Sequence, residues 1–377
     1  MTFPHVRVEG APRERGRSYG EQARERVRRS IDAYREVFAA YAGWDWPTVT
    51  DHARAYEEPI ERFDPVYLEE MRGIAEGAGV ADADVLAINV RTEVMFAAKA
   101  REARQVGECS AFAVTPARSA DGHTLIGQNW DWLLHSADTV VVLEARQPDR
   151  PDFVTVVEAG LLAKTGMNSS GIGLVTNALV SDADRGDPGV PYHVALRAVL
   201  DAETISDTYA LLQRASRSSS ANYLIAHRDG QAVNIEGAPG DFHELSLTFP
   251  DEGLLLHTNH FVSGGRQGRR DVGLWVMPDS PFRLDRLRAQ TGSAPSLSLK
   301  DFRQALADHA NHPSGICCHP DGRWDPLEQG ETVASVLMDL DARRMWLAEG
   351  RPCTTPYREL DYADFLAKPP AVPAPPA

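Results

Sequence analysis

The sequence predicts an α+β fold in which layered sheets are covered by helices on the outside. Two observations carry this prediction. Up to about residue 100 the apolar positions recur at helical spacing with few breakers, whereas from Cys109 onward apolar runs alternate with turn residues in hairpin order. A run of helices followed by a run of antiparallel strands is typical of this class.

The first part of the chain predicts helices only. RGRSYGEQARERVRRSIDAYREVFAAYA forms a long amphipathic stretch from Arg15, and no strand is expected before Cys109. Further helical patterns cover residues 56–63, 65–78 and 82–100.

The second part predicts mainly hairpins. SAFAVTP and HTLIGQNW flank an Ala-Asp-Gly turn, TVVVLEAR precedes FVTVVEA, and NYLIAHRDGQAVNIEG and TVASVLMDLDARRMWLAEG each read as a hairpin. KTGMNSSGIGLVTNAL and LLLHTNHF contain further strands, and helices are expected at 192–215, 282–290 and 299–308. We therefore divide the chain into a helical segment, a sheet-rich segment and a Pro-rich tail, at residues 1–108, 109–365 and 366–377.

Composition limits the partners and the compartment. A formal net charge of −15 over 377 residues argues against nucleic acid or an anionic membrane as the main partner. The start of the chain lacks a signal-peptide pattern, and no apolar run reaches the roughly 18 residues of a membrane span. Four cysteines in a chain of this length do not make a disulfide framework, so we expect a cytoplasmic protein with reduced thiols.

Cys109, in GECSAFAV, stands at the head of a predicted strand. A cysteine in a strand is more often a packing residue than a reactive one. A cysteine that begins a chain, however, has its own α-amine within reach, and that amine has a pKa near 8 and can accept the thiol proton. This chemistry needs a backbone cut before Cys109, a carboxylate to orient the amine, and hydrogen-bond donors for the substrate carbonyl.

Polar residues at the ends of other predicted strands could supply these groups. Asp131 in GQNWDW could orient the amine, and Asn177 and Asn259 could donate to a carbonyl. Each asparagine taken alone is more simply a turn residue, so only the set points to chemistry. Trp130 and Trp132 flank Asp131, and we expect one to face the core and the other to line a pocket.

Six segments in order resemble the acyl-coenzyme A:6-aminopenicillanic acid acyltransferase family, peptidase family C45, a branch of the N-terminal nucleophile hydrolases. They are ERGRSYGEQAR, CSAFAV, GQNWDW, NSSGIGLVTNAL, HTNHF and DHANHPSGICCHP. The resemblance implies a four-layer αββα fold and a precursor that cuts itself between Glu108 and Cys109. It also implies that the two pieces remain together as a heterodimer, and it leaves a higher oligomer open.

The resemblance implies roles for individual residues. Cys109 would be the nucleophile, Asp131 would orient its amine, and Asn177 and Asn259 would bind the oxyanion or the substrate. Four further residues are expected in substrate binding, namely Gln128, Trp130, His260 and Arg283. Gln128 stands where the related choloylglycine hydrolases carry an arginine, and Arg283 matches an arginine near the nucleophile.

The implied activity is hydrolysis or transfer of an acyl group on an amide. The substrate would be an N-acyl amine, an acyl-amino acid or a peptide-like metabolite, including a β-lactam of antibiotic biosynthesis, with acyl-CoA as a possible co-substrate and no other cofactor. Two departures bear on this: Glu108 replaces the glycine frequent before the cut, and Cys318 replaces an arginine of the family's Ile-Cys-Arg.

Two other functions compete with this interpretation. A catalytically silent binding protein would have Cys109 as a packing residue. A metal-dependent hydrolase would use the cluster at 309–319, but its spacing fits no standard zinc pattern, so we predict no metal. The members of that cluster are His309, His312, Cys317, Cys318 and His319.

Overall fold

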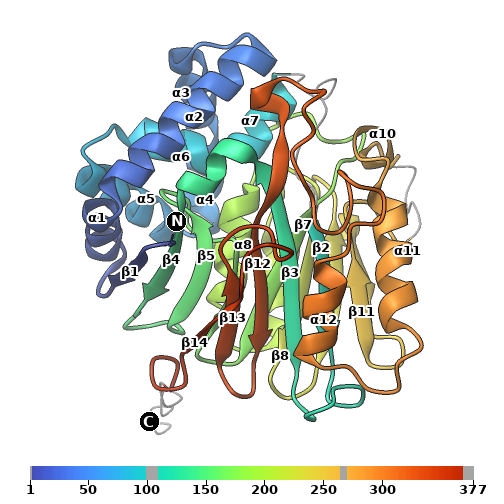
Figure 1. Ribbon diagram of the computed structural model, residues 1–377. Helices are drawn as coiled ribbons and strands as arrows, with labels where there is room; N and C mark the ends of the chain where they lie inside the picture. The colour runs from blue at the N-terminus through green and yellow to red at the C-terminus, as the bar shows by residue number, and fades with distance from the viewer. Residues whose placement is uncertain (1, 99–108, 264–269, 368–377) are drawn as a thin grey trace, which may run out of the picture.

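A computed structural model describes residues 2–98, 109–263 and 270–367 of the chain. It contains two β-sheets between two groups of helices (Figure 1). The N-terminal helices gather against one sheet, and two later helices cover the other sheet on the opposite side.

Seven helices follow one another in the first part of the chain. They are α1 (Pro12–Gln22), α2 (Arg24–Ala42), α3 (Trp46–Ala53), α4 (Glu57–Phe63), α5 (Val66–Ala78), α6 (Asp82–Asn89) and α7 (Arg91–Ala97). The long stretch predicted from Arg15 is divided between α1 and α2 at Ala23, and the 82–100 pattern is divided between α6 and α7 at Val90. Helix α3 was not predicted.

The expectation of no strand before Cys109 is wrong. Strand β1 (His5–Val8) pairs in parallel with β4 (Val140–Ala145), with His5 opposite Val142. Only four residues long, with just two of them buried, β1 is too short for its alternation to stand out in the sequence.

The first sheet has eight strands in the order β1-β4-β5-β6-β7-β8-β9-β10. After β4 its strands are β5 (Phe153–Glu158), β6 (Thr165–Asn168), β7 (Ile172–Ala178), β8 (Ala221–His227), β9 (Ala232–Gly237) and β10 (Leu245–Thr248). β4 and β5 are buried at every residue, because helices cover one face and the second sheet covers the other. The predicted 192–215 helix is two helices, α8 (Tyr192–Leu200) and α9 (Ile205–Arg214).

The second sheet has six strands in the order β11-β2-β3-β12-β13-β14. Their bounds are β2 (Cys109–Val114), β3 (Leu125–Leu133), β11 (Leu254–His257), β12 (Gly330–Asp339), β13 (Arg344–Ala348) and β14 (Arg358–Asp361). The short α10 (Gly273–Val276) precedes α11 (Ser280–Thr291) and α12 (Leu299–Leu306), whose apolar side chains pack on this sheet. The four-layer αββα architecture is therefore confirmed.

Helices α1 and α5 approach each other closely through glycines. A Cβ added at Gly77 would lie 2.0 Å from the carbonyl oxygen of Arg17, and one added at Gly16 would lie 2.1 Å from that of Glu70. Buried Arg15 donates to Glu70 across the same contact at 2.6 Å. The segment ERGRSYGEQAR thus contains the buried residues of α1, which are Arg15, Gly16, Tyr19 and Gly20.

Within the described residues, no helix combines the length and the apolarity that crossing a membrane requires. The division of the chain at residues 108 and 365 stays a prediction, and most of the Pro-rich tail lies outside the described residues.

Candidate active site

Cys109 is the first residue of β2 and is buried. It lies opposite Trp130 of β3. Its backbone N–H donates to Oδ1 of Asn259 at 2.7 Å, and its carbonyl oxygen accepts from Nδ2 of Asn177 at 3.1 Å and from Nη1 of Arg283 at 2.9 Å. Three side chains therefore hold the peptide groups on both sides of this residue.

The three side chains come from three different layers. Asn177 is near the end of β7 in the first sheet, Asn259 follows β11 in the second sheet, and Arg283 is in the first turn of α11. All three were expected near Cys109, and in the structure all three form hydrogen bonds with its backbone.

Asn259 is oriented by its other bonds. Its Oδ1 also accepts from Nη2 of Arg283 at 3.0 Å, while its Nδ2 donates to the carbonyl oxygen of Ala178 at 3.0 Å. The Nε of Arg283 donates in turn to Asp279 at 2.6 Å. The guanidinium thus connects α11 to the start of β2.

A buried polar network behind Asn177 was not predicted. Oδ1 of Asn177 accepts from Asn222 and lies 3.1 Å from Nδ1 of His257, whose Nε2 lies 2.9 Å from Oε1 of Glu236. Glu236 in β9 and His257 in β11 were not predicted because the strands around them are mainly apolar. The network holds the amide of Asn177 with its nitrogen toward Cys109.

Asp131 lies on β3 beside this site and is fully buried. Its Oδ1 accepts from Oγ1 of Thr332 at 2.5 Å, while its Oδ2 has no partner in the part of the chain that the structure describes. Burial raises the pKa of this carboxyl to about 8, against the opposing effects of Thr332 and Arg283. Because Asn259 accepts the Cys109 N–H, the role of Asp131 toward the amine stays a prediction.

We expect Asp131→Asn to remove a pH dependence of stability. A carboxyl whose pKa is raised on folding binds its proton more tightly in the folded state, so stability is lost as pH rises from about 4 toward 8. The loss approaches about 1.4 kcal/mol per pH unit in that window. Urea unfolding at pH 5, 6 and 7, in a Cys109→Ala background that keeps the chain uncut, measures it. Equal slopes with and without the Asp131→Asn substitution would contradict the raised pKa.

A small cavity of about 40 Å³ opens beside the thiol. That volume has room for about three water molecules. Cys109, Trp132, Lys164 and Tyr192 line it, together with a group from α7 and the end of β7: Arg91, Thr92, Met95, Phe96, Ala178 and Leu179. An acyl chain entering here would meet mainly apolar walls.

Lys164 is a buried cation that the sequence analysis missed. Burial lowers its pKa to about 8, and its Nζ lies 4.7 Å from the ring centre of Trp130. Burial raises the pKa of the Cys109 thiol to about 11, while the Lys164 charge opposes that rise. Lys164 is one of four lysines in the sequence and lies between apolar runs. It was not predicted as a site residue because it belongs to no recognisable motif.

Arg91 is the second missed cation. Its Nη2 donates to Glu158 at 2.7 Å, and its guanidinium lies over Trp132 at 4.3 Å from the ring centre. Its Nε and Nη1 have no hydrogen-bond partner among the described residues. Two donors are therefore left on a buried guanidinium at the cavity wall.

The remaining predicted residues lie outside the cavity lining. Gln128 accepts the backbone N–H of Thr176 at 2.6 Å and so joins the two sheets, and Trp130 is buried between them. His260 lies 2.8 Å from Oγ of Ser280, and burial beside His257 lowers its pKa to about 4, so it is neutral.

Trp130 and Trp132 share one face of β3, since they are two residues apart, and both lie beside Lys164. As expected, one of them, Trp130, is buried in the core, and the other, Trp132, lines the cavity; the two differ in depth rather than in the face of the strand. Glu108 lies outside the described residues.

Two sequence comparisons relate the chain to known proteins. The family model described as acyl-coenzyme A:6-aminopenicillanic acid acyl-transferase matches residues 118–354, beginning after Cys109. The acyl-coenzyme A:6-aminopenicillanic-acid-acyltransferase 40 kDa form of Emericella nidulans is 26% identical over 352 residues, covering 92% of this chain and 93% of its own.

Two solved structures resemble the chain more distantly. A mutant of the conjugated bile acid hydrolase from Clostridium perfringens aligns with 68% of this chain and 94% of its own, at 14% identity and a TM-score of 0.47. Penicillin V acylase from Agrobacterium tumefaciens aligns with 69% and 88%, at 14% identity and a TM-score of 0.41.

The family match spans more than half of the chain, and it includes Asp131, Asn177, Asn259 and Arg283. The chain belongs to the acyl-coenzyme A:6-aminopenicillanic acid acyltransferase family.

Proposed function

We propose that this protein is a self-cleaving cysteine amidohydrolase or acyltransferase that uses Cys109 as an N-terminal nucleophile. The observation that carries the proposal is the hold on Cys109: Asn259 accepts its N–H, while Asn177 and Arg283 donate to its carbonyl oxygen. In most strands these backbone groups are paired by a neighbouring strand, whereas here polar side chains from three different elements pair them.

The cut would begin with attack of the Cys109 thiol on the carbonyl carbon of Glu108. The C–N bond to Cys109 breaks as the C–S bond forms, and the thiol proton passes to the nitrogen. Water then hydrolyses the thioester, leaving a carboxylate on Glu108 and a free amine and thiol on Cys109. The products are residues 1–108 and 109–377.

The mature Cys109 would then attack the substrate's amide carbonyl. The α-amine, with a pKa near 8, takes the thiol proton and passes it to the departing amine. Nδ2 of Asn177 and of Asn259 are the donors proposed for the oxyanion, since amides donate without titrating. Asp131 is proposed to hold the α-ammonium through Oδ2, which has no hydrogen-bond partner among the residues that the structure describes.

The cavity supports a substrate with an apolar acyl group and a nearby carboxylate. Apolar walls suit the acyl group, and Arg91 offers two nitrogens, Nε and Nη1, that have no hydrogen-bond partner in the described part of the chain and lie beside the buried Lys164. Acyl-amino acids and acylated β-lactam nuclei both fit this description. Water or an amine would take the acyl group from Cys109, and acyl-CoA could serve as an acyl donor.

The heterodimer is part of the proposal. β1 and the α1–α7 helices belong to the 1–108 piece, and they pack on the sheet built by the 109–377 piece. The two pieces would therefore stay together after the cut.

The intact mass of the denatured protein tests the proposal. We expect two fragments that separate between Glu108 and Cys109, and one more equivalent of a thiol-reactive probe on the native wild-type protein than on the Cys109→Ala variant, because the other three cysteines are common to both. A single uncut chain whose Cys109 does not react would overturn the self-cleaving enzyme and favour a binding protein of the same fold.

We expect Arg283→Lys to slow the cut by about 10- to 100-fold. Lysine keeps the charge but cannot donate to the Cys109 carbonyl, Asn259 and Asp279 together, and hydrogen bonds to charged groups contribute about 1.5–3 kcal/mol. A time course of intact mass after a short expression pulse measures the rate. Arg286→Lys is the control, because Arg286 lies on the same helix in an exposed ion pair with Asp308. This variant should cut normally.

A further inference from the structure

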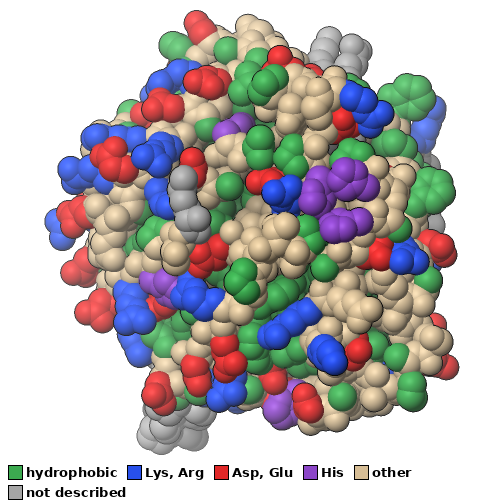
Figure 2. All heavy atoms as spheres, in the orientation of Figure 1, with side chains coloured by type: hydrophobic (Ala, Val, Ile, Leu, Met, Phe, Trp, Pro, Cys, Tyr) green, Lys and Arg blue, Asp and Glu red, His purple; other side chains and the backbone are tan. Residues whose placement is uncertain are grey.

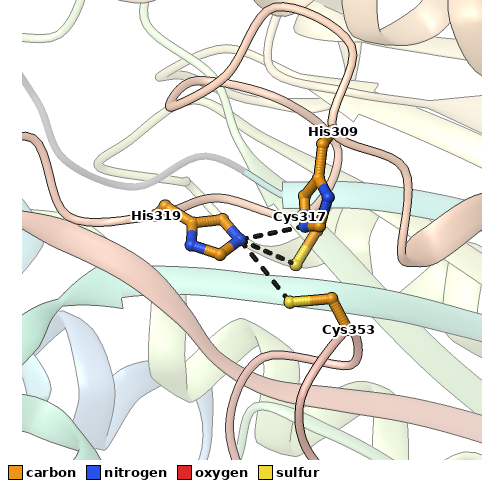
Figure 3. Close-up of side chains that lie close together, drawn as sticks. All are labelled: His309, Cys317, His319 and Cys353. Atoms are coloured by element: carbon orange, nitrogen blue, oxygen red, sulfur yellow. Dashed lines mark hydrogen bonds between the residues drawn. The ribbon is translucent and has the colours of Figure 1, made fainter.

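A second group of reactive side chains lies on the surface, apart from the Cys109 cavity. Figure 2 shows histidine side chains gathered on one face of the molecule. The rings of His309, His312 and His319 lie within 4.8–6.2 Å of one another, centre to centre. Beside them are Cys317 and Cys353 (Figure 3).

Four of these side chains direct their donor atoms toward one point. Nε2 of His319 lies 3.0 Å from Nε2 of His309, 3.7 Å from Sγ of Cys317 and 3.5 Å from Sγ of Cys353. All four donor atoms lie within 4.8 Å of one another. One ring nitrogen carries at most one proton, so hydrogen bonding cannot satisfy all three contacts of His319.

These distances fit a tetrahedral metal site. Zinc–nitrogen bonds of about 2.0–2.1 Å and zinc–sulfur bonds of about 2.3 Å place neighbouring ligand atoms about 3.3–3.8 Å apart. The three contacts of His319 lie close to that range, so only small movements would be needed. Two imidazoles and two thiolates form a donor set that favours Zn²⁺ among abundant metals.

We propose that His309, Cys317, His319 and Cys353 bind one zinc ion. Four protein ligands leave no open coordination position, so this site is structural and does not activate water. The proposal is independent of the activity assigned to Cys109. It departs from the sequence-based expectation of no metal, which considered a cluster with His312 and Cys318 in place of Cys353.

The surrounding backbone already fixes the ligands. The N–H of Cys317 donates to the carbonyl oxygen of Asp308 at 3.0 Å, and that of Cys318 donates to Oγ1 of Thr332 at 3.0 Å. Cys353 comes from the loop between β13 and β14. The ion would therefore connect the segment that follows α12 to the loop between β13 and β14 in the second sheet.

Arg351 is the group that must move. Its Nη1 lies 2.9 Å from Nδ1 of His319, and a guanidinium can only donate, so it keeps the ring proton on Nε2. Binding at Nε2 requires the proton on Nδ1. Glu331, 3.3 Å from Nε of Arg351, offers the guanidinium an alternative partner when it turns away.

The proposed zinc site is connected to Asp131 through the hydroxyl group of Thr332. Thr332 accepts the N–H of Cys318 and donates to Asp131. Zinc removal should therefore loosen the segment that positions the Asp131 carboxyl, while leaving Asn177, Asn259 and Arg283 in place.

Metal content tests the site directly. The full-length protein, purified without chelator under reducing conditions, should carry about one zinc per chain by elemental mass spectrometry. After metal removal, Co²⁺ should give the intense visible bands of a tetrahedral thiolate complex. Cys353→Ser should lose the bound zinc and weaken Co²⁺ binding at least about 100-fold, while remaining folded by circular dichroism.

Cys318→Ser is the matched control, since its sulfur contacts the backbone oxygens of His319 and Gly330 rather than the ligand centre. It should retain the metal and the Co²⁺ bands. Absence of tight binding in the reduced wild-type chain would overturn the proposal. So would metal binding that survives Cys353→Ser, or a Cys317–Cys353 disulfide that persists under reducing conditions and excludes the ion.

Discussion

Cys109→Ala should leave the chain uncut and abolish turnover of any amide substrate. The sulfur is the only group proposed to form a bond to carbon, both in the cut and in the acyl-enzyme, so alanine removes both steps. A methyl group also fits the buried position at the head of β2, so folding should be preserved. Intact mass and hydrolysis of acyl amides, measured on the same preparation, check the two losses together.

Two companion variants separate chemistry from folding. Cys109→Ser keeps a hydroxyl that can still attack, so slow cutting with at least about 100-fold lower turnover is expected from its weaker nucleophilicity. Cys318→Ser, a buried cysteine outside the cavity, should cut and turn over normally. Cleavage that persists in Cys109→Ala would show that another group, or another protein, makes the cut.

Lys164→Met should make the protein more stable and less active. Because burial lowers the pKa of this lysine from 10.5 to about 8, the unfolded chain binds its proton more tightly between those values. Stability therefore rises with pH from about 8 to 10.5, and below pH 8 the full cost of the buried charge, about 3 kcal/mol, remains. Methionine removes that cost. Part of the gain in stability is offset because the cation–π contact with Trp130 is lost.

The same substitution should raise the pKa of the Cys109 thiol. The Lys164 charge is the largest influence that lowers that pKa, so its loss should reduce the thiolate fraction and turnover at pH 7, with the deficit shrinking at higher pH. Urea unfolding and a pH–rate profile measure the two effects. Lys300→Met, on an exposed lysine, is the control; a loss of stability in Lys164→Met would contradict the buried charge.

The sheets could be predicted because their strands carry continuous apolar runs separated by turn residues. β2, β3, β8, β9, β12 and β13 all overlap predicted hairpins. β1, β10 and β14 were missed because each has only four residues and at most two of them are buried, so no apolar run marks the strand. Helix boundaries failed at Ala23 and Val90, where neither Gly nor Pro marks the break.

The candidate site was predictable only in part, for a physical reason. Asn177 and Asn259 were proposed from their places at the ends of predicted strands and from the resemblance, whereas Arg283 came from the resemblance alone, since nothing in its spacing relates it to Cys109. Lys164 and Arg91 are single charges inside apolar segments, and only the fold makes them neighbours of the thiol. Cys353 was not considered a ligand because it lies far from the other three in the sequence, and only the folded β13–β14 loop brings it beside them.

The pairing of β1 with β4 also sets an order of events during synthesis. The helices that follow β1 leave the ribosome long before Val142 exists to receive His5, and the N–H of Phe3 finally bonds to Glu349, near the other end of the chain. Until the strands of the first sheet have been synthesised, the apolar faces of α1–α7 have no sheet to cover them. A partly synthesised chain therefore exposes apolar surface, the feature that makes folding intermediates prone to aggregate.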